Sequence, residues 1–267
     1  MHEKERADNL IKSANGFMSM ERFDGHAKAY TVGRPDYAEE LIECLYSDYG
    51  VSASSVIADI GSGTGKFSRH LLERGSEVYS VEPSDDMRSI AETELGRYPN
   101  FHSVKGNAEN TTLKADLADY ITTAQAFHWF DVSRFRQECM RIIKDNGKVI
   151  LVWNRRDDLD PLNQELYKVY SDDCPEFKGF GGGILKDDQR IKDFFGSGYD
   201  YRSFDHPLCL DKEMFVARSL SASYSLKEGD AGYEAYMEAL LDVFNRYADN
   251  GSVTIANKSV AYIGSIK

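Results

Sequence analysis

The sequence lacks long apolar runs, and its few cysteines are scattered. The four cysteines are Cys44, Cys139, Cys174 and Cys209, and no two of them form a CxxC pair. This spacing favours free reduced thiols over a disulfide framework or a zinc site. No apolar run approaches the ~20 residues of a membrane-spanning helix, and the charged residues 1–6 are not followed by an apolar signal core. We therefore expect a cytoplasmic protein that does not contact a membrane.

Positive charge and metal-binding histidine patterns are also scarce. The 32 Lys and Arg residues are outnumbered by 44 Asp and Glu residues, which gives a formal net charge of −12. Because that charge repels polyphosphate, a nucleic-acid substrate is disfavoured, although a local basic patch would escape this argument. The six histidines show neither HExxH nor another paired-ligand spacing, so we predict no metal site.

The composition that remains is that of an ordinary globular protein. Hydrophobic residues make up 42% of the chain and charged residues 28%. A chain of 267 residues is long enough for one large α/β domain, or for a core domain that carries an insertion. The sequence shows no internal repeat and no low-complexity block.

Residues 55–82 combine the parts of a nucleoside-binding half-fold. The apolar run 56–60 predicts a strand buried on both faces, and a loop with three glycines follows it at once. Glycine alone lets a backbone turn sharply and approach a ligand closely. A helical pattern then ends at Gly75, and a second strand ends on Glu82. This acid lies about 20 residues past the first glycine, where a carboxylate can accept hydrogen bonds from ribose hydroxyls.

Two related glycine motifs do not fit this loop. A P-loop needs four residues between its glycines before Lys and Ser or Thr, whereas the spacing from Gly61 to Gly65 is one residue short and Phe67 follows Lys66. The dinucleotide motif GxGxxG needs a glycine where Lys66 stands. The spacing is GxGxG, with Asp59 two residues before the first glycine.

The run DIGSGTG, from Asp59 to Gly65, resembles the first motif of class I S-adenosylmethionine-dependent methyltransferases, and Glu82 resembles their ribose-binding acid. The resemblance implies an α/β, Rossmann-like, doubly wound and mostly parallel sheet of seven strands in the order 3-2-1-4-5-7-6, with strand 7 antiparallel and helices on both faces. It also implies S-adenosyl-L-methionine as cofactor and S-adenosyl-L-homocysteine as product. The cofactor-binding residues that it implies up to the second strand are Asp59, Gly61, Ser62, Gly63, Thr64, Gly65 and Glu82.

Two segments after Glu82 extend this resemblance. A helix is predicted to begin after Ser84, and Met87 in its first turn is either near the adenine, as in the family, or an ordinary packing methionine. The sequence GNAE at 106–109 follows a predicted third strand and resembles the adenine-contacting loop of the family. It implies that Asn107, Ala108 and Glu109 bind the cofactor.

The segment before the core resembles a subgroup that includes trans-aconitate methyltransferases. Its pattern is Phe23, then Tyr30, then Arg34-Pro-Asp-Tyr37. In that subgroup the segment folds over the cofactor, which implies that Tyr30 and Arg34 bind it and that Arg34 pairs with the methionine carboxylate. The alternative is that Arg34 is a solvated turn residue and Tyr30 a core residue.

Residues 118–124 predict a fourth strand, and the sequence QAFHWF follows it at the edge where open α/β sheets bind ligands. This run also resembles the trans-aconitate-like subgroup. We assign Gln125 to the cofactor, and His128 and Trp129 to the acceptor. His128 is either a catalytic base or orienting residue, or simply structural. Arg155, after a fifth strand at 148–153, either receives an anionic substrate group or is solvated.

The predicted organisation is a single domain in five parts. They are a flexible N-terminus (1–20), an N-terminal helical lid (21–50), a cofactor-binding core (51–156), a substrate cover inserted after strand five (157–198), and a C-terminal completion of the same sheet (199–267). Within the core, residues 145–147 (Asp-Asn-Gly) predict a turn between a helix and the fifth strand.

The predicted function is in-line methyl transfer from S-adenosylmethionine (EC 2.1.1 class) to a small-molecule acceptor. A carboxylate acceptor follows only from the subgroup resemblance. One alternative is an NAD-dependent oxidoreductase on a similar fold, which Lys66 and the GNAE loop disfavour. Another is a non-catalytic methyltransferase-like binding subunit, which the intact glycine loop and Glu82 disfavour. A monomer and a homodimer both remain open.

Overall fold

The computed structural model describes residues 35–180, 184, 186–196 and 198–267, so the predicted sites Tyr30 and Arg34 lie outside the described residues. Its main body is a seven-stranded sheet in the order β3-β2-β1-β4-β5-β9-β6. The strands are β1 Val56–Ile60, β2 Glu77–Val81, β3 Phe101–Val104, β4 Ala118–Ala124, β5 Ile143–Arg156, β6 Asp200–Asp205 and β9 Asn257–Gly264. Strand β9 runs antiparallel to both of its neighbours, and the other pairs are parallel. The predicted strand order, with an antiparallel last strand, is confirmed.

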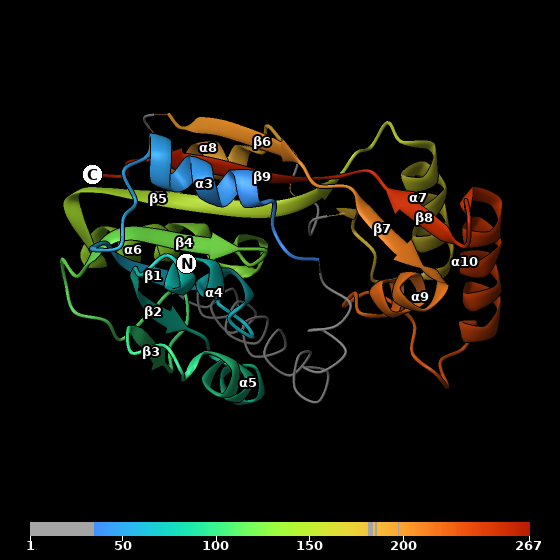
Figure 1. Ribbon diagram of the computed structural model, residues 1–267, viewed down its shortest axis with the longest axis horizontal. Helices are drawn as coiled ribbons and strands as arrows, with labels where there is room; N and C mark the ends of the chain where they lie inside the picture. The colour runs from blue at the N-terminus through green and yellow to red at the C-terminus, as the bar shows by residue number, and fades with distance from the viewer. Residues whose placement is uncertain (1–34, 181–183, 185, 197) are drawn as a thin grey trace, which may run out of the picture.

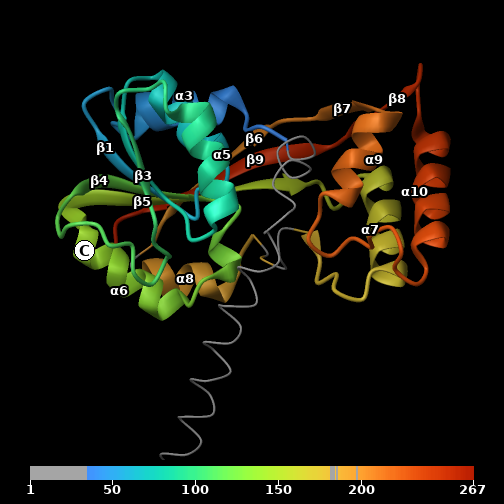
Figure 2. The same cartoon turned by 90° about the horizontal axis from the view of Figure 1, so that it is seen from below.

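Helices cover both faces of the sheet, which explains why its central strands are apolar throughout (Figure 2). On one face, residues of α3 (Glu39–Asp48) and α4 (Lys66–Glu73) pack against inward side chains such as Val152. On the other face, α6 (Val132–Ile142) and α8 (Gln189–Phe195) pack around Trp153. The alternation of Val152 and Trp153 between the two clusters is the period of two expected of a strand.

Side-chain caps begin two of the helices, and the first of them is where the sequence predicts it. The hydroxyl of Ser84 accepts a hydrogen bond from Met87 N at the start of α5 (Asp85–Leu95). The carboxylate of Asp131 accepts one from Arg134 N, 3.1 Å away, at the start of α6. Each cap satisfies a backbone donor that the first helical turn leaves without a partner.

Strand β5 differs from its predicted extent, because Asp145–Gly147 lies within the strand and the predicted turn there is wrong. Its pairing with β4 shifts register between Ala118 and Tyr120, so extra residues are accommodated as an irregularity of the strand. A side chain at Gly147 would place its Cβ 2.8 Å from Asp119 O and 2.4 Å from Ile143 Cγ1. The glycine is therefore explained by close backbone approach within the sheet and not by a turn.

A second group of elements lies beyond the C-terminal end of β5 and the N-terminal end of β9 (Figure 1). It contains the helices α7 (Pro161–Asp173), α9 (Lys212–Leu220) and α10 (Tyr233–Tyr247). It also contains a two-stranded antiparallel sheet of β7 (Leu208–Asp211) and β8 (Ser252–Ile255). These elements share a core of their own, which includes Leu166, Phe215 and Leu240. We call residues 157–180 and 206–256 the small lobe.

The small lobe groups the chain differently from the predicted division at residue 198. Helix α8 lies within the predicted cover, yet Phe194 packs against the sheet beside Phe135 and Trp153. Conversely, residues 206–256 leave the sheet after β6 and return only at β9, so their apolar side chains bury against α7. Among the described residues, no helix combines the length and the apolar character that crossing a membrane requires.

Candidate cofactor-binding site

The carboxyl ends of β1 to β5 lie along one edge of the sheet, and the glycine loop stands at the centre of this edge. Gly61 N and Ser62 N donate to Val81 O at 2.9 and 3.2 Å, which ties the loop to the end of β2. Gly61, Gly63 and Gly65 all have positive φ, at 68°, 58° and 79°. This left-handed backbone strongly favours glycine over residues with a side chain.

The three glycines have different surroundings. A Cβ at Gly61 would lie 2.7 Å from the Ala126 Cβ, and a Cβ at Gly65 would lie 2.4 Å from Leu95 Cδ1. A Cβ at Gly63 would meet no described atom within 4 Å. Gly61 and Gly65 therefore allow the loop to pack on the protein, whereas Gly63 presents bare backbone to open space.

Glu82 is bound to this open part of the loop. Its Oε2 accepts a hydrogen bond from Gly63 N and its Oε1 accepts one from Ser84 N, both at 2.9 Å. The residue is 8% exposed. Burial raises the pKa of Glu82, and the N–H groups of Ser84 and Gly63 oppose this rise without cancelling it. Since a carboxylate has about four acceptor positions, roughly two remain for hydroxyl donors of a ligand.

Asp59 lies beneath the loop and is fully buried. Its carboxylate accepts hydrogen bonds from Ser68 Oγ at 2.6 Å and from Thr122 Oγ1 at 2.8 Å. Burial raises the pKa of Asp59 to about 6, against the lowering effect of both hydroxyls. Through these bonds Asp59 joins β1 to α4 and β4, so it supports the loop and does not face a ligand.

Three further residues predicted to bind the cofactor, two in the glycine loop and one in α5, differ in their exposure. Ser62 is partly exposed, but its Oγ is buried and has no hydrogen-bond partner among the described residues. Thr64 is 7% exposed, and Met87 in the first turn of α5 is 3% exposed. The last two side chains line the interior around the loop more than its surface.

The 106–109 loop after β3 is held in shape by its own side chains. Asn107 Oδ1 accepts hydrogen bonds from Glu109 N at 3.1 Å and from Asn110 N at 2.8 Å. Glu109 Oε1 accepts one from Asp131 N at 2.9 Å, which connects the loop to the start of α6. Ala108 is buried in the core cluster around Trp153.

The 125–130 loop after β4 packs against the glycine loop. Phe130 would lie 3.1 Å from a Cβ at Gly61, which shows how closely the two loops approach. Gln125 has a positive φ of 59°, and its Nε2 donates to Asn154 O at 3.3 Å. His128 and Trp129 form a short 3₁₀ turn with Phe127, with their rings 4.9 Å apart. Trp129 is 38% exposed, whereas Phe127 is buried.

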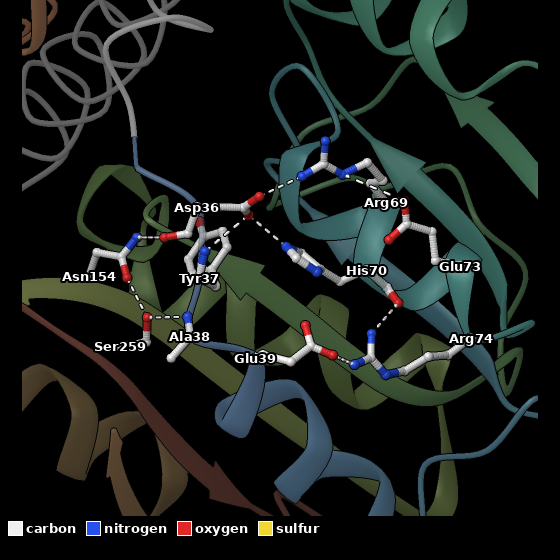
Figure 3. Close-up of polar contacts among 10 residues, drawn as sticks. All are labelled: Asp36, Tyr37, Ala38, Glu39, Arg69, His70, Glu73, Arg74, Asn154 and Ser259. Carbon is white, nitrogen blue, oxygen red and sulfur yellow. Dashed lines mark hydrogen bonds and ion pairs between the residues drawn. The ribbon is translucent and has the colours of Figure 1, made fainter. Parts of the chain in front are cut away.

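Sequence reasoning missed a polar network at the point where the chain enters the described core (Figure 3). Asp36 Oδ2 lies 2.5 Å from Arg69 Nη2, and its Oδ1 lies 2.6 Å from His70 Nε2. Burial acts to raise the pKa of Asp36, but the hydrogen bond and charge of His70, the Tyr37 N–H and the charge of Arg69 together lower it to about 2. The network attaches residue 36 to α4, the helix that begins at the glycine loop.

The same network continues to the two longest neighbouring strands of the sheet (Figure 3). Asn154 Nδ2 donates to Asp36 O at 2.9 Å, and Ser259 Oγ donates to Asn154 Oδ1 at 2.6 Å. Ser259 Oγ also accepts from Ala38 N at 2.9 Å. Residues 36–38 are thus held between α4, β5 and β9. Only the Arg-Pro-Asp-Tyr pattern signalled this segment in the sequence, and it gave no indication of partners from β5 and β9.

Arg155 lies on the face of β5 that carries Trp153. Its Nη2 donates to Tyr262 Oη at 3.2 Å, and its guanidinium lies over the rings of Trp153 and Tyr262 at 5.8 and 5.9 Å. Among the described residues, no group of three or more His, Cys, Asp and Glu side chains is arranged to hold a metal ion.

Residues 58–151 match the family model described as "Methyltransferase domain". The chain is 26% identical over 255 residues to an uncharacterized methyltransferase-like protein of Schizosaccharomyces pombe, covering 92% of this chain and 95% of that one. It is 34% identical over 151 residues to an uncharacterized methyltransferase of Mycobacterium bovis, covering 57% of this chain and 59% of that one. This alignment therefore spans less than two thirds of the mycobacterial relative.

Two solved structures share the fold at low sequence identity. A proposed type II methyltransferase from Anaeromyxobacter dehalogenans has a TM-score of 0.60 at 20% identity, covering 87% of this chain and 98% of that one. A phosphoethanolamine N-methyltransferase from Haemonchus contortus, solved with S-adenosylhomocysteine, has a TM-score of 0.51 at 15% identity, covering 89% of this chain and 56% of that one.

These similarities confirm the predicted resemblance to class I methyltransferases in both domain and fold. The same similarities confirm the prediction that the class of enzyme is a methyltransferase. The trans-aconitate-like subgroup is not confirmed.

Proposed function

We propose that this protein, whose residues 58–151 form a methyltransferase domain on a class I fold, methylates a small-molecule acceptor with S-adenosyl-L-methionine. The observation that carries the proposal is the bond between Gly63 N and Glu82, at the one glycine of the loop that faces open space. A bare backbone segment beside a buried carboxylate with spare acceptor positions suits a ribose better than it suits a pyrophosphate.

The residues around the glycine loop fit the cofactor. Glu82 would accept hydrogen bonds from the ribose hydroxyls beside the open space at Gly63. The Asn107–Glu109 loop and Met87 would border the adenine. Gln125 and Thr64 would border the remaining part of the cofactor. The structural neighbour from Haemonchus contortus, which contains S-adenosylhomocysteine, supports the choice of this ligand.

Bound S-adenosylmethionine supplies an activated methyl carbon, so the chain has to position the reactants and exclude water. The Asp36 network holds residue 36 against α4, the helix that begins at the glycine loop, and against β5. This supports the assignment of the preceding segment as a cover, with Tyr30 and Arg34 bound to the cofactor. His128 and Trp129 would border the acceptor, with His128 as a base for a protonated nucleophile or as an orienting residue. Arg155 is the residue that the sequence alone assigns to an anionic group of the acceptor.

The acceptor we propose is a small molecule, and a carboxylate is the first class to test. The formal net charge of −12 disfavours a nucleic-acid acceptor. We place the protein in the cytoplasm, in agreement with its scattered cysteines. A nicotinamide oxidoreductase remains the alternative on a similar fold, and NAD is the ligand that distinguishes it.

Calorimetric titration of S-adenosylhomocysteine tests the cofactor site. The wild type should bind it and should not bind NAD, and Glu82→Gln should weaken the affinity by about 10- to 100-fold, because hydrogen bonds to a charged acceptor are lost. Glu77→Gln, at the other end of the same strand β2 and partly exposed, is the matched control and should bind normally. Equal affinity for wild type and Glu82→Gln would remove the ribose assignment, and binding of NAD alone would favour the oxidoreductase.

A further inference from the structure

Arg156, the last residue of β5, has a cationic side chain without an acidic partner. No described residue forms a hydrogen bond or an ion pair with its guanidinium, and its Nη1 is buried. The guanidinium carbon lies 4.5 Å from the ring centroid of Phe180 and 5.8 Å from that of Tyr170. Aromatic faces attract a cation, but they neither neutralise its charge nor accept its N–H donors.

Other polar atoms at the same junction between the sheet and the small lobe are also without partners. The hydroxyl of Tyr170 is buried and forms no hydrogen bond with the described residues, and this side chain is fully buried. Asn257 is the register partner of Arg156 on β9, so their side chains share a face of the sheet. Its Oδ1 is likewise buried without a partner, although its Nδ2 donates to His206 O at 3.3 Å.

An arrangement of this kind is unfavourable unless a ligand completes it. Guanidinium stays charged at any physiological pH, and although Arg156 is partly exposed, its buried Nη1 loses water without gaining an acceptor, which is costly. Buried polar atoms nearly always have a hydrogen-bond partner, so several buried polar atoms without one at the same junction indicate a missing partner. The atoms without a partner are an arginine donor, a hydroxyl and an amide oxygen. The planar guanidinium group of arginine can form two parallel hydrogen bonds to a carboxylate.

We propose that Arg156 anchors a carboxylate group of the methyl acceptor, with the aromatic pair Tyr170 and Phe180 fixing the orientation of the guanidinium. The inference rests on the proposed methyltransferase function and identifies the class of acceptor as an organic acid. It also replaces Arg155 as the principal anion ligand, because Arg155 Nη2 already donates to Tyr262 and its side chain lies on the opposite face of β5, although its Nε is likewise buried without a partner among the described residues. The small lobe, by supplying Tyr170 and Phe180, selects the acceptor from outside the methyltransferase domain of residues 58–151.

Calorimetry on the full chain, saturated with S-adenosylhomocysteine, tests this anchor with matched pairs of probes. The acids are acetate, succinate and benzoate, and their neutral counterparts are acetamide, succinamide and benzamide. At least one acid should bind the wild type while its amide does not. Arg156→Met should weaken the binding of that acid by about 10- to 100-fold, as expected for loss of a hydrogen-bonded charge, and Arg156→Lys should weaken it less.

The controls separate this anchor from the cofactor site and from general effects of charge. Arg246→Gln removes a lobe cation that already pairs with Glu165 on α7, so acid binding should not change. Both Arg156 variants should bind S-adenosylhomocysteine as the wild type does, which also shows that they fold. Weaker cofactor binding in Arg156→Met would assign the arginine to the methionine carboxylate instead and overturn the inference.

The inference is also overturned if no acid in the panel is preferred over its amide, or if Arg156→Met binds the acid normally. Either result leaves the proposed function standing as long as S-adenosylhomocysteine binds the wild type. Failure of S-adenosylhomocysteine to bind the wild type would instead reject the proposed function itself.

Discussion

The two acids at the glycine-loop edge of the sheet and the polar residues at the junction with the small lobe satisfy their polar atoms in opposite ways. At the loop, Asp59 and Glu82 each accept two hydrogen bonds from the chain. At the junction, Arg156, Tyr170 and Asn257 each keep a buried polar atom without a described partner. The first region is therefore organised before a ligand arrives, whereas the second is completed by one. A cofactor shared by a whole class of enzymes suits the first arrangement, and an acceptor particular to one enzyme suits the second.

Substitution of the loop glycines should have the largest effect and tests whether the loop is open only at Gly63. Gly65→Ala places a Cβ 2.4 Å from buried Leu95 and imposes a side chain at φ 79°, so we expect a loss of about 2 to 4 kcal/mol in unfolding free energy. Gly63→Ala meets no described atom and should lose only about 1 to 2 kcal/mol, while it weakens S-adenosylhomocysteine binding. Urea denaturation measures both. Equal losses for the two variants would show that Gly63 does not face open space.

The buried carboxylate beneath the loop should give a pH dependence of intermediate size. Because burial raises the pKa of Asp59 from 3.8 to about 6, the folded state holds this proton more tightly than the unfolded state. Its contribution to stability is fully present below about pH 4 and is lost as pH rises through 6. The loss is roughly 3 kcal/mol for a shift of about two units, as an upper estimate.

Asp59→Asn should remove this pH dependence while keeping an oxygen acceptor for Ser68 or Thr122. The difference in unfolding free energy between wild type and variant should therefore favour the wild type more at pH 4 than at pH 7. Denaturation at both pH values measures it. A difference that does not change with pH would mean that Asp59 is not desolvated as the structure shows.

The smallest effect is expected at the junction. Tyr170→Phe removes a hydroxyl that has no partner among the described residues and keeps the ring beside Arg156. The unfolding free energy should stay the same or rise by up to about 1 kcal/mol, because no hydrogen bond within the chain is lost. A loss of more than about 1 kcal/mol in unfolding free energy would show that the hydroxyl has a hydrogen-bond partner in the folded protein. The junction would then satisfy its polar atoms within the chain, as Asp59 and Glu82 do at the glycine loop.

The parts of the fold that follow local rules could be predicted. The glycine loop, Glu82 and the capping residue Ser84 depend on spacing over a few residues, and the structure has them where the pattern places them. The strand order follows from the class of fold that these motifs indicate. The assignment of cofactor and substrate residues stays a prediction that the binding experiments address.

The features that could not be predicted depend on partners far apart in the chain. The irregularity of β5 at Gly147 is set by Asp119 on the neighbouring strand, and the sequence Asp-Asn-Gly by itself indicates a turn. The Asp36 network needs Asn154 and Ser259, which lie 118 and 223 positions further along the chain. No periodic pattern reports such pairs.

The two arginines at the end of β5 show the same division. The sequence places Arg155 and Arg156 side by side, and they point to opposite faces because β5 continues past its predicted end at 153 to Arg156. Only the tertiary structure decided that Arg155 donates one hydrogen bond to Tyr262, while Tyr170 and Phe180 give Arg156 aromatic contacts and no acceptor. Local sequence sets the direction of a side chain through backbone geometry, but the groups it meets are set by the packing of distant segments, which burial of apolar surface drives.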